Sequence, residues 1–160
     1  MVRGGRGPVS DPHDELLLAI QRLGRLMGSR QVSSRLAEAA GARVSQQGVQ
    51  ILRVLLRHGE QPVAGLAAAA QMDISAVSRQ LHPLEDAGLV RRGTAADDGR
   101  VALVSLTPAG RRLAERIREV GVQHLRDSLR DWSAADTRHL ARLMSRLVDD
   151  LQQTEVPTPE

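Results

Sequence analysis

Residues 73–110 read DISAVSRQLHPLEDAGLVRRGTAADDGRVALVSLTPAG, and the rest of the chain is interpreted outward from this stretch. Three apolar residues in it recur at the spacing of one helical face: Val77, Leu81 and Leu84. Asp73 is a residue type that caps the start of a helix, and Gly88 is typical of the residue just after a helix end. The stretch therefore begins with a short helix that we expect to bury one apolar face.

A β-hairpin is predicted directly after this helix. Residues 89–92 and 101–106 are typical of two short strands. Between them, residues 93–100 include the sequence Ala-Asp-Asp-Gly, in which Asp and Gly favour turn conformations. We therefore expect two strands joined by a polar loop.

Helical periodicity upstream predicts three further helices. The first runs from residue 14 to about residue 40 and ends at Gly41, and the second begins after its cap, Ser45. The third is short, near residues 62–70, with Pro62 at its start because proline is favoured in the first turn. The short third helix, an interruption at Gln71-Met72-Asp73 and the helix that follows resemble a helix-turn-helix.

Two more helices are predicted downstream. Thr107 and Pro108 form a cap and first-turn signature for a fifth helix, which runs to about Asp131. Ser133 with Asp136 resembles a capping box for a sixth helix. This last helix carries an apolar seam at nearly heptad spacing: Leu140, Leu143, Leu147 and Leu151.

The order of these elements predicts the fold class. Two short helices around a tight turn, followed by a hairpin, make a winged helix-turn-helix, which lays its second short helix in the major groove of DNA. The fold is therefore expected to be mainly α with a small β-hairpin wing, flanked by N- and C-terminal helices.

The composition is that of one globular domain without cysteine chemistry. The chain has 160 residues, of which 41% are apolar, enough to form a core. It contains no cysteine, which excludes disulfides, thiolate zinc sites and a cysteine nucleophile. No apolar run approaches the roughly 20 residues of a membrane span, and the first 15 residues lack the apolar segment of a secretory signal. We therefore expect a cytoplasmic protein with no membrane contact.

The charge of the chain is smaller than its isoelectric point suggests. All 22 cationic residues are Arg, so a net charge of only +3 accompanies an isoelectric point of 11.0. Residues 62–106 carry four Arg against five acids, a formal charge of −1. Any DNA affinity therefore depends on individually placed contacts rather than on a strongly basic surface.

The outward face of the helix after Asp73 carries the candidate DNA-binding residues. Opposite the apolar stripe lie five small or hydrogen-bonding residues: Ser75, Ala76, Ser78, Arg79 and His82. The Arg79 guanidinium can bind guanine O6 and N7, the two serines can bond phosphate or base edges, and Ala76 can contact a thymine methyl. The alternative interpretation is an ordinary solvated helix face.

Pro83 falls inside this predicted recognition helix. Proline lacks a backbone N–H, so the hydrogen bond to the Arg79 carbonyl cannot form. We therefore expect the helix to bend or loosen near His82.

Three motifs resemble the multiple-antibiotic-resistance regulator (MarR) family of bacterial transcription factors. They are Leu84-Glu85 with Ala87-Gly88-Leu89-Val90, then Asp98-Gly99-Arg100, then Leu106-Thr107-Pro108-Ala109-Gly110. The resemblance covers residues 14–152 and implies a homodimer whose terminal helices interlock and whose winged domains bind a palindromic DNA operator, usually to repress nearby genes. It also implies that Arg100 enters the minor groove, braced by Asp98, and that a small-molecule effector binds between the dimer helices and the winged domain.

Physical chemistry supports the implied role of the wing. A narrow minor groove has a negative potential that attracts Arg, and a nearby carboxylate can hold the guanidinium in one orientation. An exposed pair such as Asp98 and Arg100 contributes only about 0–1 kcal/mol to stability, so stability is a poor reason for it. Arg91 and Arg92 adjoin this loop, and each is a candidate for a phosphate contact.

The terminal helices are expected to form a homodimer. Their apolar residues exceed what one small winged domain can cover. The predicted organisation begins with a flexible arm (residues 1–13) and an N-terminal dimerisation helix with its connection (14–44). A DNA-binding domain (45–106), C-terminal dimerisation helices (107–152) and a tail (153–160) follow. Trp132, the only aromatic residue, is expected to be a core or dimer anchor. Because the chain has no other aromatic side chain, an effector pocket that stacks aromatic rings is hard to build.

Three other functions compete with DNA binding. An enzyme is not expected, and neither is a cofactor or a metal, because the five His show no HExxH spacing and the chain has no GxSxG or phosphate loop. A metal-responsive regulator would use His124 and Asp127, which are about one helical turn apart, although such residues are more often a surface pair. A winged helix that binds only proteins stays open as an alternative, since a fold does not fix a function.

Overall fold

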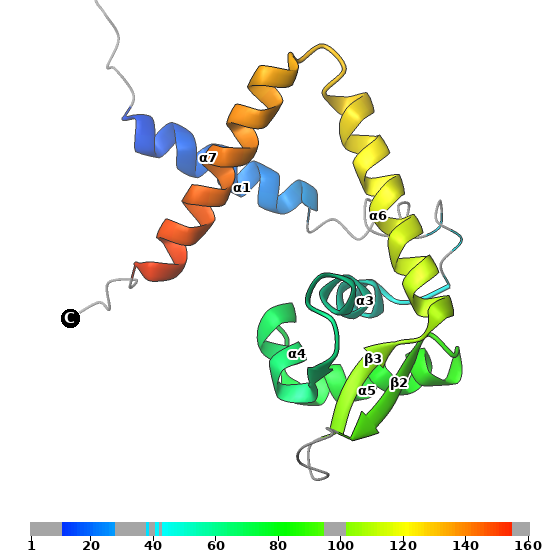
Figure 1. The fold of residues 1–160 in the computed structure, drawn as a ribbon. Helices are drawn as coiled ribbons and strands as arrows, with labels where there is room; N and C mark the ends of the chain where they lie inside the picture. The colour runs from blue at the N-terminus through cyan, green and yellow to red at the C-terminus, as the bar shows by residue number, and fades with distance from the viewer. Residues whose placement is uncertain (1–10, 28–37, 39–40, 42, 95–101, 155–160) are drawn as a thin grey trace, which may run out of the picture. The chain divides into compact units, whose positions relative to one another are not determined.

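The computed structural model describes residues 11–27, 38, 41, 43–94 and 102–154. Across these residues the chain is mainly helical and carries one small antiparallel sheet, as the sequence predicts (Figure 1). The chain forms two compact units, residues 1–121 and residues 122–160. In the described ranges, no helix combines the length and the apolar character needed to cross a lipid bilayer.

The first unit contains the winged domain, which we define as residues 45–106. Its elements are α3 (Gln46–His58), β1 (Gln61–Pro62), α4 (Val63–Ala70), α5 (Ile74–Asp86), β2 (Val90–Thr94) and β3 (Ala102–Leu106). Figure 1 shows β3 leading directly into the long helix α6 (Pro108–Ser128). The predicted second to fifth helices and both predicted strands are thereby confirmed.

Three of the four predicted side-chain caps are confirmed. The hydroxyl groups of Ser45, Thr107 and Ser133 each accept a hydrogen bond of 3.0 Å from the backbone N–H three residues later. Asp73 occupies the N-cap position of α5, but its side chain makes no capping hydrogen bond. Its contribution is therefore limited to a negative charge near the positive end of the helix dipole.

The sheet contains a strand that the sequence did not predict. The strand order is β1-β3-β2, and β1 pairs with β3 through Gln61 opposite Val104 and Pro62 opposite Leu103. A strand of two residues has no alternating pattern to detect. Pro62 is tolerated because β1 lies at the edge of the sheet, where a missing N–H breaks no ladder.

The wing hairpin is longer than predicted on one side. β2 extends through Thr94, whereas the sequence predicted an end at Arg92. Gly93 and Thr94 continue the antiparallel pairing with β3. The sequence pattern did not predict this extension, because the pairing is made by hydrogen bonds between backbone groups rather than by side chains. The rest of the predicted loop, residues 95–100, and the predicted first residue of the second strand, Val101, lie outside the described residues.

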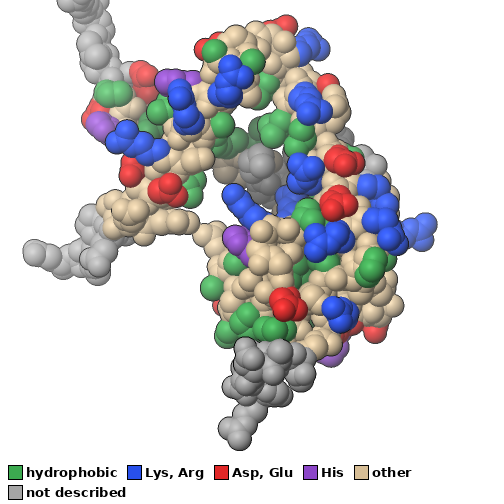
Figure 2. Space-filling model, viewed as in Figure 1, with side chains coloured by type: hydrophobic (Ala, Val, Ile, Leu, Met, Phe, Trp, Pro, Cys, Tyr) green, Lys and Arg blue, Asp and Glu red, His purple; other side chains and the backbone are tan. Residues whose placement is uncertain are grey.

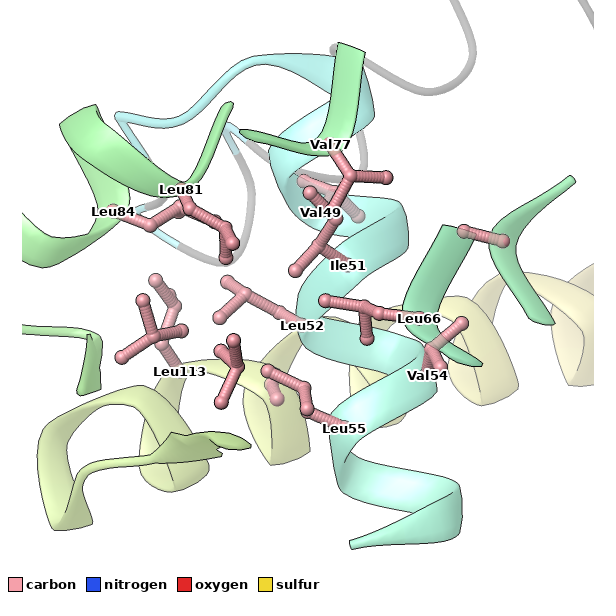
Figure 3. Close-up of a cluster of buried hydrophobic side chains, with 14 of the residues drawn as sticks. Val49, Ile51, Leu52, Val54, Leu55, Leu66, Val77, Leu81, Leu84 and Leu113 are labelled. Carbon is pink, nitrogen blue, oxygen red and sulfur yellow. The ribbon is translucent and has the colours of Figure 1, made fainter. Parts of the chain in front are cut away.

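The core lies between the helices of the winged domain and the start of α6. Figure 3 shows Leu52 of α3 lying between Leu81 of α5, Leu66 of α4 and Leu113 of α6. Its largest fully buried side chains come from α3, α4, α5, β3 and α6: Ile51, Leu52, Leu55, Leu66, Val77, Leu81, Leu84, Val104 and Ile117. Burying such a side chain contributes about 1.5–3 kcal/mol relative to full exposure. Because α3 supplies Ile51, Leu52 and Leu55, it is the central helix of this core.

Two of the described helices, α1 (Pro12–Met27) and α7 (Ala134–Gln153), lie outside this core. α1 confirms the first half of the predicted first helix, whose continuation to Ala40 falls almost wholly outside the described residues. α7 confirms the sixth helix. α6 ends at Ser128 rather than at Asp131, because residues 129–132 form turns.

Trp132 is not a core residue of the single chain. It lies in the connection between α6 and α7 and is 48% exposed. The prediction that it anchors the core of the single chain is therefore wrong, because the connection leaves the side chain at the surface beside His139, Leu140 and Leu143 of α7. The alternative that the sequence offered, an anchor in a dimer, stays a prediction.

A tight joint connects the end of α5 to the beginning of α6. The Thr107 N–H donates to the Leu89 carbonyl at 3.0 Å, and the Thr107 hydroxyl donates to the Gly88 carbonyl at 2.6 Å. A Cβ atom on Gly110 would lie only 1.8 Å from the Leu89 carbonyl oxygen. Glycine is therefore required at position 110 by the close approach of α6 to Leu89, the residue before β2.

We expect Gly110→Ala to destabilise the protein. The new methyl group cannot move away from backbone atoms, so we expect a loss of about 3 kcal/mol in the free energy of unfolding, at the upper end of overpacking effects. Urea unfolding at a fixed protein concentration measures this loss.

The matched control is Gly121→Ala, in the same helix, where a Cβ atom would have no neighbour within 4 Å. We expect this change to stabilise the protein by about 0.5–1 kcal/mol through helix propensity. Equal effects of the two substitutions on the free energy of unfolding would contradict the steric clash predicted between a side chain at position 110 and the Leu89 carbonyl.

Candidate nucleic-acid interface

The turn between α4 and α5 sets the direction of α5. Gln71 has a left-handed backbone conformation with a φ of 51°. The N–H of Gln71 donates to the Ala68 carbonyl at 3.1 Å, and the N–H of Met72 donates to the Ala67 carbonyl at 2.9 Å. These bonds close α4 and redirect the chain. The interruption that the sequence shows at residues 71–73 is therefore the turn of the helix-turn-helix.

α5 is held in place by one apolar face and one polar contact. Val77, Leu81 and Leu84 are buried, as the sequence predicts. The Ser45 hydroxyl donates a hydrogen bond to the side-chain oxygen of Gln80 in the middle of α5. Because Ser45 also caps α3, a single side chain links the start of α3 to α5.

The residues predicted to contact DNA share the other side of α5. Ser75, Arg79 and His82 are exposed, and Ala76 and Ser78 are half-buried at the edges of this surface. The spacing places Ser75, Arg79 and His82 as neighbours along the helix surface. Among the described residues, Arg79 has no ion-pair partner. We call Ser75, Ala76, Ser78, Arg79 and His82 the outer face of α5.

Pro83 lies inside the recognition helix, and the bend predicted near His82 stays a prediction. α5 continues through Pro83 to Asp86, and Leu84 directly after the proline is buried. The missing N–H leaves the Arg79 carbonyl without its helical partner. The packing of Leu84 into the core therefore outweighs the local cost of the proline.

Arg91 and Arg92 point to opposite faces of the sheet. Arg91 pairs with Ser105, and Arg92 pairs with the buried Val104. Arg92 Nε lies 3.0 Å from a carboxylate oxygen of Glu85 on α5, whereas Arg91 is exposed and has no ion pair among the described residues. The sequence did not reveal the Glu85 pair, because no periodic pattern links residues on either side of a turn.

The two predicted wing residues are Asp98 and Arg100. Asp98 and Arg100 belong to residues 95–101, which lie outside the described residues. The described parts of β2 and β3 lead toward them from both sides. Their contact with each other and with DNA stays a prediction.

Sequence reasoning missed one exposed residue at the start of α5. Ile74 is the first residue of this helix and is 57% exposed. Ile74 precedes Val77 by three residues, so the apolar periodicity places it in line with the buried stripe. It is exposed because the N-terminal end of α5 extends past the core, which only the tertiary structure reveals.

The fold and this surface define a class of protein. Two short helices joined by a tight turn, with the outer side of the second left open and a β-hairpin beside it, are a winged helix-turn-helix. The three strands and the packing of α3 against α4 and α5 complete that arrangement.

Comparisons with known proteins assign the chain to a family within this class. The family model of the MarR family matches residues 44–102. The chain is similar to YxaD of Bacillus subtilis, an uncharacterised helix-turn-helix transcriptional regulator, with 31% identity over 61% of this chain and 68% of YxaD. It is also similar to the transcriptional repressor IacR of Pseudomonas putida, with 24% identity over 64% of this chain and 62% of IacR.

A solved structure shows the same fold over nearly the whole length. The crystal structure of NadR in complex with 4-hydroxyphenylacetate superposes with a TM-score of 0.67 at 22% identity, covering 94% of this chain and 99% of NadR. The chain belongs to the MarR family. It is therefore a transcriptional regulator of the helix-turn-helix type rather than an enzyme, as the sequence predicts.

The residues considered for a metal site do not assemble one in the described ranges. Asp127 accepts a hydrogen bond from the Gln123 side chain at 2.9 Å, and His124 belongs to no cluster of three potential ligands. Asp127 therefore behaves as part of an ordinary polar helix surface.

Proposed function

We propose that the protein binds a pseudo-palindromic DNA operator as a homodimer and represses nearby genes until a small molecule releases it. The observation that carries this proposal is the outer face of α5. It offers a guanidinium and two hydroxyl groups on a helix whose opposite side is fixed in the core. Its side chains can therefore enter the major groove without disturbing the fold.

Each residue of this face has a distinct role in the proposal. Arg79 donates two hydrogen bonds to guanine O6 and N7, which requires a guanidinium that is free of internal partners. Ser75 and Ser78 bond phosphate or base edges, and Ala76 contacts a thymine methyl. His82 lies one turn beyond Ser78 and contacts the DNA backbone or a base edge. Arg79 thus supplies most of the direct sequence readout.

The wing supplies contacts that position the domain. Arg100 inserts into the minor groove, and Asp98 holds its guanidinium in one orientation. Arg91 contacts a phosphate, which its exposure permits. The Nε of Arg92 is engaged by Glu85, which leaves the outer N–H groups of that guanidinium for a phosphate. Residues 62–106 carry four Arg against five acids, so these contacts act individually rather than as a basic field. Arginines are interspersed with acids along α6 as well (Figure 2).

The homodimer is supported by two helices with uncovered apolar side chains. On α1 and α7 the large apolar residues that stay exposed are Leu16, Leu17, Leu18, Ile20, Leu23, Leu26, Leu143, Met144, Val148 and Leu151. α7 buries none of its residues in the single chain. Burial of such surface against a second copy is favourable at about 25 cal/mol per Å². The proposed dimerisation segments are therefore residues 14–44 and 107–152, with Trp132 as an anchor.

Repression and effector release are the parts of the proposal that rest on relatives. IacR is named a repressor, and NadR is seen with 4-hydroxyphenylacetate. The present chain has one aromatic residue, so its effector pocket would rely on aliphatic and Arg side chains. A smaller anionic ligand fits that composition better than a ring-stacked one.

The dimer is tested by an acidic substitution on the apolar side of α7. Leu143 is 51% exposed in the single chain, and Leu143→Glu would place a charge inside the proposed interface. We expect wild type to be a dimer at micromolar concentration by light scattering and this variant to dissociate at least about tenfold more readily. Ser145→Glu, on the polar side of the same helix, should remain dimeric. A monomeric wild-type protein would refute the proposed assembly.

DNA reading is tested by comparing two arginines on a selected operator. Arg79→Ala should weaken binding by about 1–3 kcal/mol per half-site and relax the preference at one base position. Arg91→Ala should weaken the binding of all DNA sequences alike. It should also reduce the slope of log binding constant against log salt concentration by about 2 in magnitude per dimer. Gel-shift titrations at several salt concentrations measure both effects. If both variants fold as wild type and bind with unchanged affinity, the contacts assigned to Arg79 and Arg91 are wrong. If the wild-type protein binds no duplex, the protein-interaction alternative replaces this proposal.

A further inference from the structure

Ile74 is the one large apolar side chain that the described part of the winged domain leaves mainly exposed. Between Ser45 and Leu106, the other large apolar residues in the described ranges are buried or half-buried. The side chain of Ile74 is therefore available to a partner from outside the chain.

The position of Ile74 connects it to the outer face of α5. It is the first residue of the helix, it is followed by the exposed Ser75, and Ser78 lies one helical turn further on. The N-terminal residues of a recognition helix are the ones that approach base edges in the major groove. If α5 binds DNA, Ile74 belongs to the end of the helix that meets the bases.

The chemistry of the groove narrows what Ile74 can contact there. Base edges in the major groove present hydrogen-bond donors, acceptors and one large apolar group, the 5-methyl group of thymine. An isoleucine side chain has no donor or acceptor, and removing water from a phosphate without a compensating bond is costly. The thymine methyl is therefore the group that Ile74 can contact favourably.

We propose that Ile74 packs against a thymine methyl and makes the N-terminal end of α5 selective for a T·A pair at one position of each operator half-site. This inference rests on the proposed function, because it requires α5 in the major groove. A single exposed apolar residue is common on protein surfaces. The place of Ile74 at the base-reading end of the helix is what gives its exposure a specific use.

The test uses a duplex selected from random-sequence DNA by the full-length protein. Each thymidine of the half-sites is replaced, in symmetric pairs, by deoxyuridine, which lacks only the 5-methyl group. At the position that Ile74 contacts we expect wild type to lose about fourfold in affinity per half-site, which corresponds to the burial of one methyl group. A second sensitive position would belong to Ala76 and would persist in Ile74→Ala. Gel-shift titration measures the loss.

Variants of Ile74 assign that loss to the residue. Ile74→Ala should bind the thymidine and deoxyuridine duplexes equally at that position, and Ile74→Val should keep most of the preference. Arg79→Ala is the matched control on the same face, because it should retain the deoxyuridine effect while relaxing a different position. Ile74 is exposed, so Ile74→Ala should melt like wild type by circular dichroism.

The possible results separate this inference from the proposed function. If the protein selects an operator but no deoxyuridine exchange weakens binding in a way that Ile74→Ala removes, the Ile74 contact is wrong. Sequence-specific DNA binding by the rest of α5 would still hold. If wild type selects no duplex at all, the proposed function fails and the contact fails with it. The deoxyuridine exchange alters only the DNA, so the wild-type measurement does not depend on the folding of any variant.

Discussion

The packing of the apolar face of α5 against α3 and α4 is the interaction on which the rest of this structure depends. Val77, Leu81 and Leu84 are buried together with Leu52 and the first turns of α6. This packing uses one side of the helix completely, so the opposite side can carry polar residues at no cost to the core. The outer face of α5 is therefore rigid because its support is apolar and extensive.

The same packing places the wing and α6 within a few residues of α5. The Leu89 N–H donates to the Leu84 carbonyl at 2.9 Å, and the Leu89 carbonyl accepts from the Thr107 N–H at 3.0 Å. Leu89 thus bonds the last turn of α5 on one side and the first turn of α6 on the other. Gly110 allows this approach, because any side chain there would strike the Leu89 carbonyl.

The sequence predicts the elements of the winged domain well because local chemistry defines them. Ser45, Thr107 and Ser133 are polar caps at helix starts, and the α5 stripe has a regular period. Gln61 and Pro62 were missed because their strand exists only through pairing with β3. The pair of Glu85 and Arg92 was missed for the same reason, since tertiary contact, and not spacing, brings these side chains together.

Exposure was the property that sequence patterns predicted least well. Ile74 continues the apolar period of α5 yet lies beyond the core, and Trp132 lies in a connection that no core of the single chain covers. The apolar period of a helix shows which residues share a face. How far along that face the residues are buried depends on the elements packed against it. The outer face of α5 was correctly located because it lies opposite residues that are buried.

Footprinting of the intact protein on a duplex that it selects from random-sequence DNA tests the central claim most directly. Two copies of α5 acting through a symmetric dimer should protect an inverted repeat whose half-site centres are about 34 Å, or about 10 base pairs, apart. Protection of a single asymmetric half-site, or recovery of no preferred sequence, would contradict the account.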